Sequence, residues 1–110
     1  MRISQEKLVA KKKNALLALD DLSKSYPEEI YFPTDAIFNR ALRIGRETLH
    51  QVTLTKVMEE YTREGIVKKA IVLRGAIFYL NDDSKSLLEG SRVGYRINTS
   101  RQQEIDVLVR

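Results

Sequence analysis

An α+β fold is predicted by the order in which helical and extended patterns follow one another in the central part of the chain. A short apolar stretch at residues 30–32 precedes two amphipathic segments, which a turn at Gly45 separates. Two apolar runs rich in β-branched and aromatic residues, at 66–72 and 76–80, flank a short connection that contains glycine. Such a pair of runs is typical of a β-hairpin. We therefore expect a short strand, two helices and a hairpin, in that order.

A further helix is expected before this region, over residues 4–24. Leucine and alanine side chains recur there at helical spacing and form an apolar stripe. The lysine run at residues 11–13 lies near that stripe, where it either contacts a phosphate backbone or forms a solvated helix face. Charge runs are mostly solvated faces, and that interpretation is preferred here.

The two central helices are delimited by capping residues and by their period. Thr34 is expected to cap the first, because its hydroxyl can accept hydrogen bonds from backbone amides of the first turn. Gly45 takes a positive φ without strain and is expected to end it. The second is expected over residues 46–64, with Leu54 and Met58 on its packed face. The outward face then holds Thr48, Gln51, Val52, Thr55, Lys56 and Glu59.

Two motifs within this region carry a family resemblance. Residues 53–56, Thr-Leu-Thr-Lys, look like the Thr-apolar-Ser/Thr-basic step common in recognition helices of bacterial regulators. Residues 61–69, Tyr-Thr-Arg-Glu-Gly-Ile-Val-Lys-Lys, resemble the helix end and the first wing strand of the same proteins. Over residues 30–80 the chain thus resembles the winged helix-turn-helix DNA-binding superfamily. The resemblance implies an α+β winged helix-turn-helix fold, with the hairpin at 66–80 as its wing.

We expect residues 1–83 to form a winged-helix domain and residues 84–110 to form a C-terminal extension of the same domain. The extension has apolar residues at alternating positions, which are Val93, Tyr95, Ile97, Ile105, Val107 and Val109. This period of two predicts a β-hairpin with its loop near residues 98–103. The alternative is a short C-terminal helix capped by Ser100 and Gln103. Either form offers an apolar surface that closes a homodimer or covers the monomer's own core.

Composition limits the other classes of protein. At 110 residues the chain has the length of one domain, and its net charge of +4 suits a polyanionic partner. It contains no cysteine, which favours a reducing compartment. No apolar run approaches the roughly 18 residues of a membrane span, and residues 1–13 lack the pattern of a signal peptide. A cytoplasmic protein without membrane contact is expected.

The sequence offers no catalytic constellation. His50 is the only histidine, so one chain cannot supply a multi-histidine metal site. We expect this imidazole to be partly buried on the side of Leu54 and Tyr61. Adjacent carboxylates on a helix diverge by about 100° and do not converge on one ion, and the glycines lack the spacing of a phosphate loop. No enzymatic activity, metal or cofactor is therefore expected.

The resemblance implies that the helix at 46–64 enters the major groove of double-stranded DNA, where its outward side chains reach base edges. Gln51 can then bond adenine, Val52 can contact a thymine methyl group, and Lys56 can bind guanine or the backbone. Further candidate contacts to bases or phosphates, from this helix, the preceding turn and the wing, are Arg46, Thr48, Thr53, Thr55, Lys68, Lys69 and Arg74. Because strand neighbours alternate faces, one wing lysine of the two is expected to contact DNA.

The expected function is sequence-specific binding of double-stranded DNA by a homodimeric transcriptional repressor or another regulator. Two alternatives use the same fold differently. In the first, a winged helix docks a protein partner through the face that holds Val52; Glu47 and Glu59, which repel phosphate, favour it. In the second, the C-terminal strands build an oligomer in a structural or assembly subunit of viral or plasmid origin.

Overall fold

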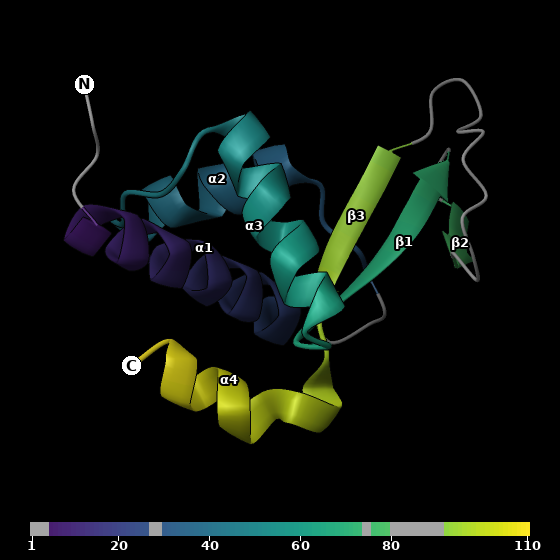
Figure 1. Ribbon diagram of the computed structural model, residues 1–110. Coiled ribbons are helices and arrows are strands. Elements are labelled where there is room, and N and C mark those ends of the chain that lie inside the picture. Colours follow the sequence, from purple (N-terminus) through teal and green to yellow (C-terminus); the bar gives the residue numbers. More distant parts are fainter. Residues whose placement is uncertain (1–4, 27–29, 74–75, 80–91) are drawn as a thin grey trace.

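The computed structural model describes residues 5–26, 30–73, 76–79 and 92–110, whose elements form the α+β fold that the sequence predicts (Figure 1). The helices are α1 (Gln5–Ser25), α2 (Thr34–Arg43), α3 (Gln51–Arg63) and α4 (Gln102–Leu108), with a 3₁₀ turn, η1 (Thr99–Arg101), before α4. The strands are β1 (Val67–Leu73), β2 (Ala76–Tyr79) and β3 (Arg92–Ile97). Within the described ranges, no helix combines the length and the apolar character that crossing a membrane requires.

The three strands form one antiparallel sheet in the order β2-β1-β3. β1 pairs with β2, as the predicted hairpin requires. On its other edge β1 pairs with β3, which places Lys69 opposite Tyr95. Phe32 forms an isolated bridge with Tyr95 on the outer side of β3, so the strand predicted at residues 30–32 is reduced to one residue pair. The sheet thus joins the hairpin of β1 and β2 to β3 and, through the bridge, to Phe32, which lies far from the strands in the sequence.

The hydrophobic core lies where α1, α2 and α3 meet one another and the sheet (Figure 1). Leu16 and Leu19 of α1 are fully buried, as are Leu54 and Met58 of α3. The packed face predicted for α3 is therefore confirmed. Because about half of the circumference of this helix faces the core, the opposite half is turned to solvent.

Helix α2 ends at Gly45, as predicted. Gly45 has a φ of +76°, and Gly65 after α3 has a φ of +79°. The amide of Arg46 donates to the carbonyl of Ala41 at 2.8 Å, which closes the end of α2 in the manner of a Schellman motif. A residue with a side chain is strained at such a φ, so glycine suits both helix ends.

The start of α2 differs from the prediction that Thr34 caps it. Pro33 occupies the N-cap position, Thr34 is the first helical residue, and no side chain caps the helix. The carbonyl of Pro33 accepts hydrogen bonds from the amides of Ala36 at 3.1 Å and Ile37 at 3.2 Å. The physical reason is the bridge at Phe32, which holds the chain extended up to Pro33 and leaves Thr34 inside the first turn.

Helix α3 begins later than predicted, because residues 46–50 are not helical. Two hydrogen bonds hold this segment against α1. The hydroxyl of Thr48 donates to the carbonyl of Lys11 at 2.9 Å, and the amide group of Asn14 donates to the carbonyl of Glu47 at 2.7 Å. The segment therefore bonds to a neighbouring helix and does not continue the hydrogen-bond ladder of α3.

The prediction for His50 is wrong for the same reason. His50 precedes α3 in an extended conformation, with φ −75° and ψ 166°, so the helical projection does not apply to it. Its side chain is exposed, and its ring lies 5.7 Å from that of Phe38, centroid to centroid.

The end of the chain is helical, so the preferred hairpin prediction for the extension is wrong and the helical alternative is confirmed, but its predicted capping by Ser100 and Gln103 is wrong, since Arg101 is the N-cap and no side chain caps α4. Residues 92–97 are a strand, but it pairs with β1, and residues 102–108 form α4. Ile105 is buried in the core, and Gln102 donates to the carboxylate of Asp20 on α1 at 3.0 Å. The alternating apolar residues at the end of the chain do not form a strand. The segment is helical and buries Ile105 in the core.

Candidate nucleic-acid interface

The solvent side of α3 carries half of the side chains predicted to contact DNA. Its centre is a stripe at helical spacing, which we call the α3 outer face and which consists of Val52, Lys56, Glu59 and Arg63. Five predicted contact residues of α3 are exposed, namely Gln51, Val52, Thr53, Thr55 and Lys56. Val52 is 73% exposed, the highest value among the large hydrophobic side chains of the described residues.

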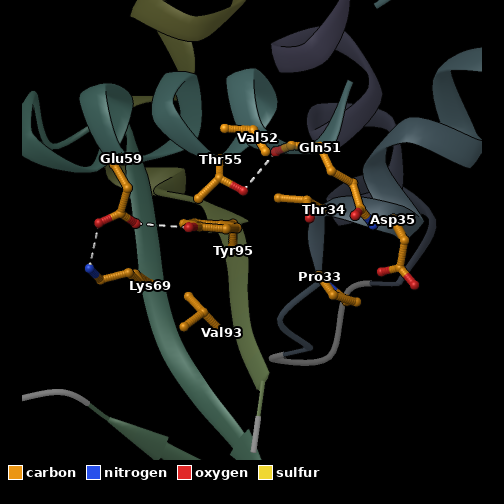
Figure 2. A pocket seen from close by; sticks show the side chains of 10 residues that line it. All are labelled: Pro33, Thr34, Asp35, Gln51, Val52, Thr55, Glu59, Lys69, Val93 and Tyr95. Atoms are coloured by element: carbon orange, nitrogen blue, oxygen red, sulfur yellow. Dashed lines mark hydrogen bonds and ion pairs between the residues drawn. The ribbon is translucent and has the colours of Figure 1, made fainter. Parts of the chain in front are cut away.

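One carboxylate of this face is held from below by the sheet (Figure 2). The ammonium group of Lys69 on β1 lies 2.8 Å from Oε1 of Glu59. The hydroxyl of Tyr95 on β3 donates to Oε2 of Glu59, also at 2.8 Å. Burial by itself would raise the pKa of Glu59, but the hydrogen bonds from Lys69 and Tyr95 outweigh it and hold that pKa below its ordinary value. Burial and the neighbouring Glu59 carboxylate together raise the pKa of Tyr95. Glu59 is therefore charged and hydrogen-bonded at neutral pH.

The second acidic residue of α3 is also paired with a lysine from another element. Lys12 on α1 lies 3.3 Å from Oε2 of Glu60. By contrast, Lys56 and Arg63 have no ion-pair partner among the residues that the structure describes. Both acids of α3 thus pair with lysines from other elements, while Arg63 also attracts Glu59 without forming an ion pair with it. The charges described on this side of the helix sum to a positive value.

The predicted contact residues outside α3 lie in different parts of the structure. Arg46 is exposed in the turn between α2 and α3. Thr48 is buried and bonded to α1, so its assignment as a phosphate contact is wrong. Lys69 faces α3, whereas Lys68 is exposed and, as its strand neighbour, points to the other face of the sheet. Arg74 lies outside the described residues.

A groove of about 590 Å³ separates α3 from the start of α2 and from the sheet (Figure 2). Its lining residues are Pro33, Thr34, Asp35, Gln51, Val52, Thr55, Glu59, Lys69, Val93 and Tyr95. The groove combines apolar walls with the hydrogen-bonded carboxylate of Glu59. In the described part of the chain, no cluster of three histidine, cysteine or acidic residues could hold a metal ion.

Two residues of this region were missed by the sequence analysis. Arg63 lies seven residues after Lys56, two helical turns along the same stripe, so the spacing alone could have identified it. Tyr95 was expected either at a dimer surface or in the monomer's own core; it is buried, and its hydroxyl supports Glu59 from the sheet. No local signal identifies that contact, because the two residues are brought together only by the pairing of β3 with β1.

The comparisons with known proteins identify no relative: no family model, no curated protein and no solved structure matches the chain. The features of the molecule that bear on its function are the exposed side chains of α3 and the charges around them.

Proposed function

We propose that this protein is a winged helix-turn-helix protein that binds double-stranded DNA without catalysing a reaction, as a transcriptional repressor or another regulator. The order of elements supports this proposal, since α1 is followed by the bridge at Phe32, by α2 and α3, and then by the antiparallel strands β1 and β3. In that architecture α3 is the recognition helix, and the hairpin of β1 and β2 is the wing.

The observation that carries the proposal is the distribution of charge on α3. DNA binding depends on cations that displace the counterions of phosphates, and a carboxylate beside them opposes it. Glu59 and Glu60 are neutralised by Lys69 and Lys12, at 2.8 and 3.3 Å, whereas the exposed Lys56 has no such partner in the described residues. Surface ion pairs add little to folding stability. The main effect of these two pairs is that the carboxylates of Glu59 and Glu60 are neutralised on this side of the helix.

The dimensions of α3 and its exposed residues agree with major-groove binding. The groove of B-DNA is about 12 Å wide and admits one α-helix, whose N-terminal half approaches the base edges. Gln51, Val52 and Thr55 lie in the first two turns of α3, where they would read bases. Lys56 and Arg63 lie further along and would contact phosphates or the edge of the site.

The proposal is tested by measuring the affinity for a pool of random duplexes at salt concentrations between about 50 and 200 mM. Each phosphate contact adds about 0.9 to the negative slope of log K against log salt. We expect Arg63→Ala to weaken binding to all duplex sequences and to reduce the steepness of the salt dependence by about 0.9. The matched control is Arg110→Ala, which removes an exposed arginine after α4. A flat salt dependence, or no binding at low salt, contradicts the proposal.

A second candidate function is a winged helix that docks a protein partner. It is favoured by the exposed isopropyl group of Val52 and by the groove beside it, whose walls include Pro33 and Val93. An assembly subunit would use such a surface in the same way. In either case the basic residues of α3 would serve solubility, and duplex binding in the salt experiment would be absent.

We also propose that the DNA-binding form is a homodimer, since two recognition helices would read half-sites about one helical turn apart. Of the apolar residues of the extension, Tyr95, Ile97 and Ile105 are buried in the monomer's core and are unavailable for a dimer contact. Val107 belongs to the same apolar residues and is 61% exposed, and its neighbour Leu108 is 42% exposed. Helix α4 therefore offers the apolar surface that remains for a dimer contact. Val107→Asp should then convert a dimer, measured by light scattering, into a monomer. A monomeric parent protein contradicts this.

A further inference from the structure

The first turns of α3 present methyl groups where a DNA-reading helix often presents donors. Val52 lies at the N-terminal end of the α3 outer face and is 73% exposed. Apolar side chains in this position recognise thymine, because its C5 methyl group is the apolar feature that the major groove displays.

Thr55 adds a second methyl group one turn along the helix. Its hydroxyl donates to the carbonyl of Gln51 at 2.8 Å, so the hydroxyl hydrogen is used within α3 (Figure 2). A threonine bonded back in this way donates no hydrogen bond to a phosphate. Its contribution to an exposed surface is then the γ-methyl group together with an acceptor oxygen.

The groups that would recognise a G·C pair are less available on the same turns. A carboxylate can accept from the amino group of cytosine, but both oxygens of Glu59 already accept, from Lys69 and from Tyr95. Guanine is read best by a bidentate arginine, and Arg63 lies in the last turn of α3, away from the N-terminal half. Lys56 is then the one exposed cation of the first two turns that could bind guanine. Gln51 is exposed in the first turn, and a glutamine amide matches adenine.

We infer that Val52 and Thr55 read the C5 methyl groups of thymine, so that the recognised site contains A·T pairs opposite the first two turns of α3. This inference rests on the DNA function proposed above and names the feature of the DNA that this helix recognises. Val52 is the main specificity residue, Thr55 contacts a neighbouring methyl group, and Gln51 bonds the adenine of the same or the adjacent pair.

The experiment begins with a duplex selected from a random pool by the full-length protein, in which each thymine is replaced in turn by deoxyuridine. This replacement removes one methyl group and keeps the base pairing. Burial of one methyl-sized group is worth about 0.8 kcal/mol, and 1.4 kcal/mol is tenfold, so binding should weaken about fourfold at one or two positions. Replacing a sensitive A·T pair by G·5-methylcytosine, which retains the methyl group, should weaken binding less than replacement by G·C.

The protein variants assign each methyl contact to a side chain. Val52→Ala should abolish discrimination between thymine and uracil at one position. Thr55→Ser removes the methyl group but keeps the hydroxyl that bonds Gln51, and it should abolish discrimination at the other. The matched controls are Val9→Ala, an exposed valine on α1, and Thr99→Ser, an exposed threonine before α4; both should discriminate as the parent does.

Two outcomes overturn this inference alone: a selected duplex that tolerates uracil at every position, or a Val52→Ala variant that still discriminates fully. A protein that selects no duplex at all overturns the proposed function and the inference with it. The failures are distinguishable, because the selection step precedes the replacement of thymine.

Discussion

The hydroxyl of Tyr95 on β3 donates a 2.8 Å hydrogen bond to the carboxylate of Glu59 on α3, 36 residues away in the sequence. The other oxygen of the same carboxylate accepts from Lys69 on β1. One charged group thus joins α3 to two strands of the sheet, beneath the face proposed to contact DNA. Hydrogen bonds to charged groups are among the stronger ones in proteins, so this junction orients the helix as well as neutralising it.

We expect Tyr95→Phe to lower the free energy of unfolding by about 1.5–3 kcal/mol, the usual cost of losing a hydrogen bond to a charged group. Urea denaturation measures the change. The matched control is Tyr26→Phe, because Tyr26 is 46% exposed and its hydroxyl makes no hydrogen bond with a described residue. A loss as small as that of the control, within about 0.5 kcal/mol, would show that the Tyr95 hydroxyl does not hold Glu59.

The stability of the protein should fall in acid partly through Glu59. The pKa of this carboxyl is lowered in the folded state, so its contribution is fully present above the ordinary value of 4.5 and is lost as the pH falls through the folded value. The free energy of unfolding of Glu59→Gln, measured by urea denaturation between about pH 3 and pH 7, should decrease less than that of the parent over the acidic part of this range. Glu64→Gln, which removes an exposed carboxylate, is the control. Equal acid sensitivity of parent and Glu59→Gln would contradict the expectation.

Removing the lysine that neutralises Glu59 should weaken DNA binding through the carboxylate that it uncovers. We expect Lys69→Met to lower the affinity for the selected duplex, and a second change, Glu59→Gln, to restore most of it. This restoration separates the charge effect from a direct contact, since a lost contact between Lys69 and phosphate is not recovered by changing Glu59. If the double variant binds as weakly as Lys69→Met, Lys69 contacts DNA itself.

Arg96 is expected to be a major stabilising residue, although it is a charged group that is only 8% exposed. Its guanidinium donates to the carbonyl oxygens of Tyr26 at 3.1 Å, Ile30 at 3.2 Å and Ser23 at 3.5 Å, near the end of α1. Arg96→Met should cost about 3 kcal/mol of unfolding free energy, because it leaves three buried or partly buried carbonyls without this donor. Arg96→Lys should lower the free energy of unfolding by a smaller amount, since an ammonium group keeps the charge but lacks the planar set of donors of a guanidinium group. A lysine variant as stable as the parent would show that the charge alone suffices.

Gly94 lies where β3 passes closest to the chain before α2. A Cβ atom there would lie 2.8 Å from Cβ and 2.9 Å from the carbonyl carbon of Tyr31, closer than packed atoms approach. Gly94→Ala should therefore destabilise the protein more than Gly45→Ala, whose added Cβ has open space and costs only the strain of a positive φ, about 1 kcal/mol. Thermal unfolding of both variants shows which of the two is less stable. The reverse order would show that β3 can move away from Tyr31.

Several features of the fold follow from local sequence. The end of α2 at Gly45, the packed face with Leu54 and Met58, the hairpin of β1 and β2, and the exposure of Val52 and Lys56 were all predicted. Each depends on periodicity or on the conformational freedom of one residue. Those properties are encoded within a few neighbouring positions, so they can be inferred without knowledge of distant contacts.

The features that were predicted wrongly all depend on a partner elsewhere in the chain. The start of α3 is set by the bonds of Thr48 and Glu47 to α1, and the helical form of the C-terminus by the packing of Ile105 into the core. A pattern of alternating apolar residues is compatible with a strand or with a short helix. The choice between them is made by the surface against which those residues pack.

The sequence by itself determined that α3 is amphipathic and that its outward side carries polar and basic residues. Only the tertiary structure decided the net charge of that side, because Glu59 and Glu60 are paired with lysines from β1 and α1, 10 and 48 residues away. The physical reason is that an electrostatic interaction depends on distance in space. Helical periodicity places the carboxylates of α3, and the folding of the sheet and of α1 against the helix places the cations that neutralise them.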